Sequence, residues 1–269
     1  MSEPTEPPYG DYDPDETHAF PDDRLHEILE LLQEDDEIAA LVAAQNVNPV
    51  TRLGFNDHGK KHVNIVRSRS LALYDLLKRQ GVTFNGARDH GLDESDEAVI
   101  IGLGATLHDV GHIVHRDHHS HWSVPIAADV LDRLLAEIYP IEKRIPLKGE
   151  ILHTIICHHA DQTPLTREAG VVRIGDALDM ERGRSREPYE SGGRGINTVS
   201  SQAIEQVHLY PGADVAVQVE IEMTNAAGVY QVDELLKSKL DGSGLEDHIR
   251  IVGVNISTDG DRIVERIEL

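Results

Sequence analysis

Apolar residues in the first two thirds of the chain recur at the three- and four-residue spacing of amphipathic helices. From Asp23 to about Asn46 this spacing follows acidic residues that suit a helix N-terminus. A later apolar stripe follows Ser95, which we expect to be the N-cap of its helix. By the same reasoning, we predict further helices over residues 57–79, 95–106, 122–139, 147–160 and 166–181.

Near residue 205 the helical spacing gives way to alternation. Between Val215 and Met223 every second residue is apolar, which predicts a strand with one buried face. A helix over 232–240 and strands over 249–256 and 262–269 are expected to follow, the last two joined by a tight turn at Asp259-Gly260. The sequence therefore predicts an α+β protein, with a mainly α-helical bundle over 23–205 and a small βαββ domain over 206–269.

The first 22 residues are acidic and proline-rich and contain no lysine or arginine, so we expect a disordered acidic tail. They show neither the basic nor the apolar stretch of a signal peptide. No apolar run approaches the roughly 20 residues that a membrane span needs. Cys157 is the only cysteine, so no disulfide can form within the chain. These features predict a cytoplasmic protein without a membrane partner.

The formal net charge of −23 bears on the partners. Such a chain repels nucleic acid and anionic membranes at long range. Aromatic residues, which stack on RNA bases, make up only 4% of the sequence and disfavour RNA further. An acidic, lysine-poor surface is also typical of proteins from a high-salt cytoplasm, and we expect a halophilic source.

Histidines point to a metal. Twelve of the 16 histidines lie between His58 and His159. Clustered imidazoles and carboxylates are typical metal ligands, although a single histidine is more often a surface or core residue. His108-Asp109 ends an apolar helix, and neighbouring residues can reach one ion only if that helix end lies beside it. The remaining ligands must then come from other helices.

The order of candidate histidines and aspartates along the chain resembles that of the HD superfamily of metal-dependent phosphohydrolases. His62 at the start of a helix, the His108-Asp109 pair with Gly111 behind it, and Asp176 match the H…HD…D pattern of that family. The resemblance covers about residues 50–185 and implies that these four residues hold a divalent ion. The strings FNDHGKKHV, HDVGHIVHR and DALDMERGRSR are similar to an uncharacterised archaeal branch with a small C-terminal domain.

Some members of this superfamily bind a second or third ion through additional histidines. The resemblance implies His119 for one of these positions, with His118 and His121 as competitors. It implies His158 from the His158-His159 pair for another. Four residues before His62, His58 should share a helix face with it. The pair is followed by Ala160-Asp161 rather than by the Glu and Gly-Tyr-Pro of relatives that cleave cyclic di-GMP.

The resemblance implies hydrolysis of a phosphomonoester or phosphodiester by a metal-bound water, with a nucleotide-like small molecule as substrate. One or two ions are expected, and a site this rich in imidazole suits Mn, Fe, Zn, Ni or Co better than Mg. Asp109 is expected to be catalytic and suits a position between two ions. Asp176 is expected to bind metal and to orient the attacking water.

Basic residues near these motifs are candidates for phosphate binding or catalysis. A glycine-rich stretch after Asp176 carries Arg182, Arg184 and Arg186, whose guanidinium groups suit a phosphate clamp. His115 and Arg116 follow the His-Asp pair, and Lys61 lies beside His62. His112 occupies the place of a phosphate-binding lysine in some relatives, and it fits a structural role equally well.

Two other functions remain open at the level of sequence. A phosphodiesterase would act on a cyclic nucleotide or on RNA ends. A non-catalytic module would sense a nucleotide through the helical bundle and contact a partner through the C-terminal domain. The full set of four core ligands favours an enzyme, because a pure binder need not keep it. The sheet edges of the small domain also suit a homo-oligomer.

Overall fold

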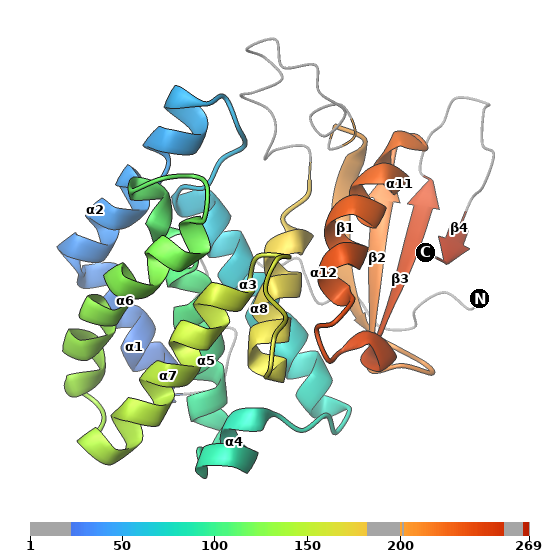
Figure 1. Cartoon of the computed structure of the whole chain (residues 1–269). Coiled ribbons are helices and arrows are strands. Elements are labelled where there is room, and N and C mark those ends of the chain that lie inside the picture. The colour runs from blue at the N-terminus through green and yellow to red at the C-terminus, as the bar shows by residue number, and fades with distance from the viewer. Residues whose placement is uncertain (1–22, 182–199, 201, 256–265, 269) are drawn as a thin grey trace.

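In the computed structural model, residues 23–181, 200, 202–255 and 266–268 are described. Among these residues, ten helices of the α, 3₁₀ and π types lie between Asp23 and Leu178. They are α1 (Asp23–Glu34), α2 (Asp36–Ala44), η2 (Val47–Arg52), α3 (Lys60–Arg79), α4 (Asn85–His90), α5 (Glu94–Leu107), η3 (Val110–Ile113), α6 (His119–Ala136), α7 (Ile141–Cys157) and α8 (Arg167–Leu178). Figure 1 shows them as one helical body beside a small sheet.

Over the described residues the sheet contains four strands in the order β1-β2-β3-β4. Their bounds are β1 (Ile204–Pro211), β2 (Val217–Met223), β3 (Ile249–Asn255) and β4 (Arg266–Glu268). β1 and β2 are antiparallel, β2 and β3 are parallel, and β3 and β4 are antiparallel. The parallel pair needs a crossover, which is the helical segment α11 (Ala227–Gln231), η4 (Val232–Lys237) and α12 (Ser238–Leu240). η5 (Glu246–His248) leads from it into β3.

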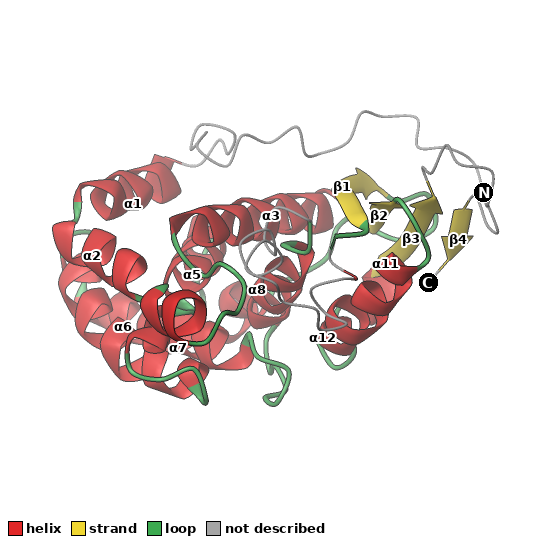
Figure 2. Cartoon of the chain, turned by 90° about the horizontal axis from the view of Figure 1, so that it is seen from above, coloured by secondary structure: helices red, strands yellow, loops and turns green. Residues whose placement is uncertain are grey.

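α5 lies at the centre of the helical body, where α1, α3, α7 and α8 contact it. Nearly all of its residues are buried. The apolar stripe expected after Ser95 therefore belongs to a helix that is covered on every side. The sheet joins this body through α3, which contacts β1 and β2, and through α8, which contacts α12. Figure 2 shows the bundle and the sheet side by side in this arrangement.

The α+β fold class is confirmed, but three local predictions are wrong. The expected helix over 23–46 is two helices, because Asp35 leaves the helical conformation and its side chain accepts from the amides of Glu37 and Ile38. Asp93, not Ser95, caps α5 and forms a reciprocal capping box with Asp96. β1 was not predicted at all. Among the described helices none is both long and apolar enough to cross a membrane.

Two expectations fall outside the described residues. The acidic segment 1–22 and the turn at Asp259-Gly260 lie there. The division of the chain at residue 205 stays a prediction, and β1 begins at Ile204.

Candidate metal centre

His108 and Asp109 lie where α5 ends. His108 is the C-cap of α5, and its Nδ1 donates to the carbonyl of Ala105 at 2.7 Å. Asp109 follows as the N-cap of η3. The tight return of the chain onto α6 depends on Gly111, because a Cβ at that position would collide with the carbonyl oxygen of His119. This close approach explains the glycine behind the His-Asp pair.

His62 lies in the first turn of α3 and is buried. Its Nδ1 lies 2.6 Å from Oδ2 of Asp179, the residue that follows α8. Because a carboxylate accepts, His62 donates there and keeps the lone pair of Nε2 for another partner. That Nε2 points toward His108, with 3.2 Å between the two Nε2 atoms.

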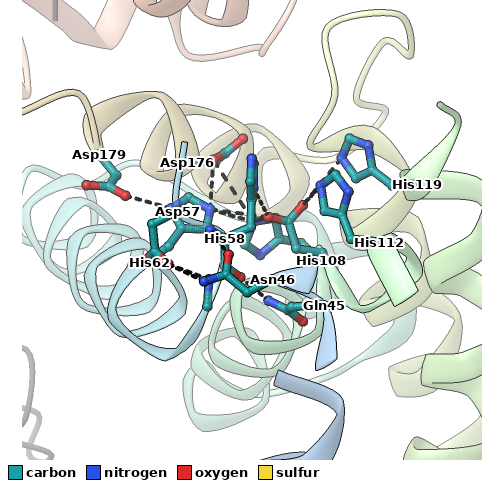
Figure 3. A network of polar contacts seen from close by, with 12 residues as sticks. Gln45, Asn46, Asp57, His58, His62, His108, His112, His119, Asp176 and Asp179 are labelled. Atoms are coloured by element: carbon teal, nitrogen blue, oxygen red, sulfur yellow. Dashed lines mark hydrogen bonds and ion pairs between the residues drawn. The ribbon is translucent and has the colours of Figure 1, made fainter. Parts of the chain in front are cut away.

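Asp176 comes from α8, which begins at the N-cap Thr166. Its Oδ1 lies 3.4 Å from Nε2 of His62 and 4.0 Å from Nε2 of His108. Its Oδ2 forms an ion pair with Nζ of Lys239. The four residues that the sequence assigns to one ion therefore converge from α3, the end of α5 and α8. Figure 3 shows His62, His108 and Asp176 in this arrangement.

The two oxygens of Asp109 face two different sets of histidines. Oδ2 is 2.7 Å from Nδ1 of His58, 3.4 Å from Nε2 of His62 and 3.3 Å from Nε2 of His108. Oδ1 faces Nε2 of His112, His119 and His158 at 3.5, 3.3 and 3.6 Å. In Figure 3, His58, His62 and His108 lie on one side of the network and His112 and His119 on the other. Asp109 thus stands between two possible ion positions.

The tautomers of the second histidine set repeat those of the first. Nδ1 of His119 donates to the carbonyl of Arg116 at 2.9 Å, and Nδ1 of His158 donates to that of Ile155 at 2.6 Å. Their Nε2 atoms then face one another at 3.0 Å. Two facing lone pairs repel each other, but both can bind the same cation. The His62–His108 and His119–His158 pairs therefore each fit a metal ion. Both ring nitrogens of buried His112 also lack a hydrogen-bond partner among the described residues.

Groups of at least three ligand atoms lie within 4.8 Å of one another in four combinations. They are His58-Asp109-His112, His62-His108-Asp109, His108-His158-Asp176 and Asp109-His119-His158. The donor set is imidazole nitrogen and carboxylate oxygen, and most of it is buried. The residues present therefore fit one or two divalent ions.

Among the competing histidines, the structure brings His119 and His158 into the cluster. His118 and His121 are exposed and pair with each other, with ring centroids 5.9 Å apart. The exposed His159 lies 2.9 Å from Asp161 through its Nδ1.

His58 lies before α3 and not on it, so the prediction of a helix face shared with His62 is wrong. The loop is held instead by the two residues that follow α2: Gln45 donates to the carbonyl of His58, and Asn46 accepts from its amide at 2.8 Å. Asn46 also donates to Asp57 at 2.6 Å. These bonds, drawn in Figure 3, hold the His58 ring against Asp109.

The electrostatics of the cluster favour an ionised Asp109 and neutral His112 and His158. Burial by itself would raise the pKa of Asp109, but the surrounding imidazoles, His108 first, bring it well below its usual value. Burial lowers the pKa of His112 to about 3 and that of His158 well below its usual value. Neutral imidazoles are the form that binds metal.

Of the basic residues predicted to bind phosphate or to act in catalysis, the described His115, Arg116 and Lys61 are not among the buried residues of the cluster. His115 is exposed and its Nδ1 accepts from the amide of Asp117 at 2.9 Å. The guanidinium of Arg116 lies 3.8 Å from the ring centroid of Phe55. Lys61 is exposed on α3. Arg182, Arg184 and Arg186 lie outside the described residues. These roles stay predictions.

Two residues of the centre were missed by sequence reasoning. Asp179 follows Asp176 by three residues, a spacing that places both on one side of a helix end and could have indicated it. Lys239 has no such signal, because its contact with Asp176 arises from the packing of α12 on α8.

Comparisons with known proteins agree with this geometry. The HD domain family matches residues 68–181, a span that includes His108, Asp109 and Asp176. A protein of Methanocaldococcus jannaschii, described only as uncharacterised, is 34% identical over 224 residues, which cover 83% of this chain and 86% of that protein. No solved structure matches the chain. The chain belongs to the HD family, a superfamily of metal-dependent phosphohydrolases.

Proposed function

We propose that this protein hydrolyses a phosphomonoester or phosphodiester of a nucleotide-like small molecule with the help of one or two divalent ions. The observation that carries the proposal is the position of Asp109, whose two oxygens face two separate histidine sets. A carboxylate that served a single hydrogen bond would not need imidazoles on both sides. The arrangement suits two ions that share one carboxylate.

His62, His108, Asp109 and Asp176 would hold the first ion. Asp109, His119 and His158 would hold the second, and His58 and His112 form a further group with Asp109 between the two positions. When bound, such an ion lowers the pKa of a water molecule to about 7 and withdraws charge from phosphoryl oxygens. Imidazole-rich ligands favour Mn, Fe, Zn, Ni or Co over Mg.

The remaining groups would orient ligands and protons. Asp179 accepts from Nδ1 of His62 and so fixes the tautomer that presents Nε2. Oδ1 of Asp176 is turned toward the cluster and would accept a hydrogen bond from the attacking water. Arg182, Arg184 and Arg186 would clamp the substrate phosphate, and His115, Arg116 and Lys61 are further candidates at the rim.

The test begins with metal analysis of the purified full chain, followed by an activity screen with added Mn²⁺ over phosphomonoesters, nucleotides and cyclic dinucleotides. We expect bound transition metal and turnover of at least one class. A folded, metal-loaded protein that is inert across the whole panel would favour the nucleotide-sensing function instead.

A further inference from the structure

A side chain of the C-terminal domain contacts the metal centre. Lys239, on α12, forms an ion pair through Nζ with Oδ2 of Asp176, while Oδ1 of the same carboxylate lies 3.4 Å from Nε2 of His62. Lys239 and Asp176 are 63 residues apart in the sequence. A carboxylate of the centre is therefore shared between the helical body and the second domain.

The packing of α12 on α8 fixes this contact, and the two lie next to each other in Figures 1 and 2. Arg173 on α8 donates to the carbonyl of Ser238 at 3.1 Å, directly beside Lys239. Gly170, one turn earlier on α8, lies so close to Ser243 that a Cβ would collide with its carbonyl oxygen. Both contacts come from the helix that carries Asp176, so they set Lys239 and Asp176 in one relative position.

Lys239 lies at the solvent-accessible edge of the cluster. The side chains of His62 and His108 are 0% exposed and that of Asp109 is 2% exposed. Those of Asp176 and Lys239 are 11% and 12% exposed. Lys239 and Asp176 thus lie nearer to solvent than His62, His108 and Asp109, as His58 and His119 also do at 12% exposure.

The chemistry of the ammonium suits an anion at this point. A lysine Nζ carries three N–H donors, and the pair with Oδ2 of Asp176 needs one of them. Lysine binds phosphate as a compact point charge. In a chain with a net charge of −23, a phosphorylated substrate needs local positive charge of this kind. His112, at the position of a phosphate-binding lysine in some relatives, is fully buried and has a pKa lowered by burial, so it does not supply this charge.

We propose that Lys239 is a phosphate-binding residue of the metal centre, so that the C-terminal domain completes the substrate site. The ligand is the phosphoryl group of the substrate, and inorganic phosphate is its simplest mimic. The inference rests on the proposed function for the site, but it concerns binding and can be measured without turnover.

The experiment compares Lys239→Met with the wild type as full-length, Mn²⁺-loaded proteins titrated calorimetrically with inorganic phosphate. The loss of one charge-assisted hydrogen bond is expected to weaken phosphate binding about tenfold to a hundredfold. Lys239→Arg should keep most of the affinity. Lys237→Met is the matched control: Lys237 is 41% exposed and pairs with Asp233 on its own helix at 3.0 Å, so its loss should leave the affinity unchanged.

Metal content and thermal midpoint are measured for every variant. Phosphate affinity that is unchanged in Lys239→Met overturns the proposal. Loss of Mn²⁺ together with phosphate also overturns it, in favour of a role limited to holding Asp176. Should Lys239→Met fail to fold, Lys239→Gln, which can still donate to Asp176 without the charge, must show the same loss. A wild type that binds phosphate through Lys239 but hydrolyses nothing would contradict the proposed function alone.

Discussion

His62 and Asp179 are 117 residues apart, yet Nδ1 of His62 lies 2.6 Å from Oδ2 of Asp179, and both side chains are nearly inaccessible to solvent. This contact makes His62 present its Nε2 toward His108 and Asp176. A partner of this kind usually fixes both the tautomer and the ring orientation of a metal-binding histidine. The stability of the centre should therefore depend on a residue that is not one of its expected ligands.

We expect Asp179→Ala to lower the affinity for Mn²⁺ or Zn²⁺ roughly tenfold to a hundredfold, because His62 loses the acceptor for its Nδ1 proton. Isothermal titration of metal into the metal-free variant measures this. Asp161→Ala is the matched control, since Asp161 pairs with the exposed His159 at 2.9 Å outside the cluster. Equal metal affinities in the wild type and Asp179→Ala would show that Asp179 does not act on the centre.

Asp109→Ala is expected to reduce Mn²⁺-dependent hydrolysis of a generic phosphoester by orders of magnitude. The variant removes the carboxylate that both histidine sets share, while the apolar core around α5 remains intact. The assay is initial-rate hydrolysis at saturating Mn²⁺, with circular dichroism to confirm folding. Asp117→Ala, which changes an 80% exposed carboxylate near the rim, should keep wild-type rates. Unchanged activity in Asp109→Ala would remove this centre from the mechanism.

The core of the site could be predicted because its signals are local. His108 and Asp109 are neighbours at the end of an apolar helix, and Gly111 behind them marks a tight return of the chain. The choice of His119 over His118 and His121 needed the structure. Only the start of α6 decides which of these rings turns inward, and His118 and His121 are exposed although they lie only one and two positions from His119.

Other features depend on contacts that no local pattern encodes. Lys239 joins the centre because α12 packs on α8, and its own neighbours in the sequence carry no sign of this. The break between α1 and α2 was missed because apolar residues remain buried on both sides of it, as Leu32 and Ile38 are. The capping oxygen of Asp35, not the hydrophobic pattern, ends the helical spacing there.

Asp35 offers a test of stability against pH. Its hydrogen bond with Arg133 lowers its pKa below the usual value. Because the folded state prefers ionised Asp35, this residue contributes to the free energy of unfolding above its unfolded pKa of about 3.9. The contribution is lost as the pH falls through the pKa of Asp35 in the folded state. Asp35→Asn keeps a capping oxygen but not the charge, and should cost up to about 1 kcal/mol at pH 7, with a smaller difference below pH about 4.

Urea unfolding of the wild type and Asp35→Asn at several pH values measures this difference. Asp35→Ala, which also loses the cap of α2, should cost about 1 kcal/mol more, by analogy with other N-caps. Glu37→Gln is the control for charge alone, since Glu37 meets the same arginine at 2.9 Å without capping. A difference between wild type and Asp35→Asn that grows as the pH falls would contradict the assigned direction of the pKa shift.

The adjacent pair His158 and His159 separates one ion from two. His158 is buried with Nε2 at 3.6 Å from Oδ1 of Asp109 and 3.0 Å from Nε2 of His119, whereas His159 is half exposed and faces Asp161. We expect His158→Ala to lose one of two bound ions and His159→Ala to keep both, as measured by elemental analysis after loading with Mn²⁺. If neither variant loses metal, the centre holds a single ion. His119 and His158 would then lie beside Oδ1 of Asp109 without holding a second ion.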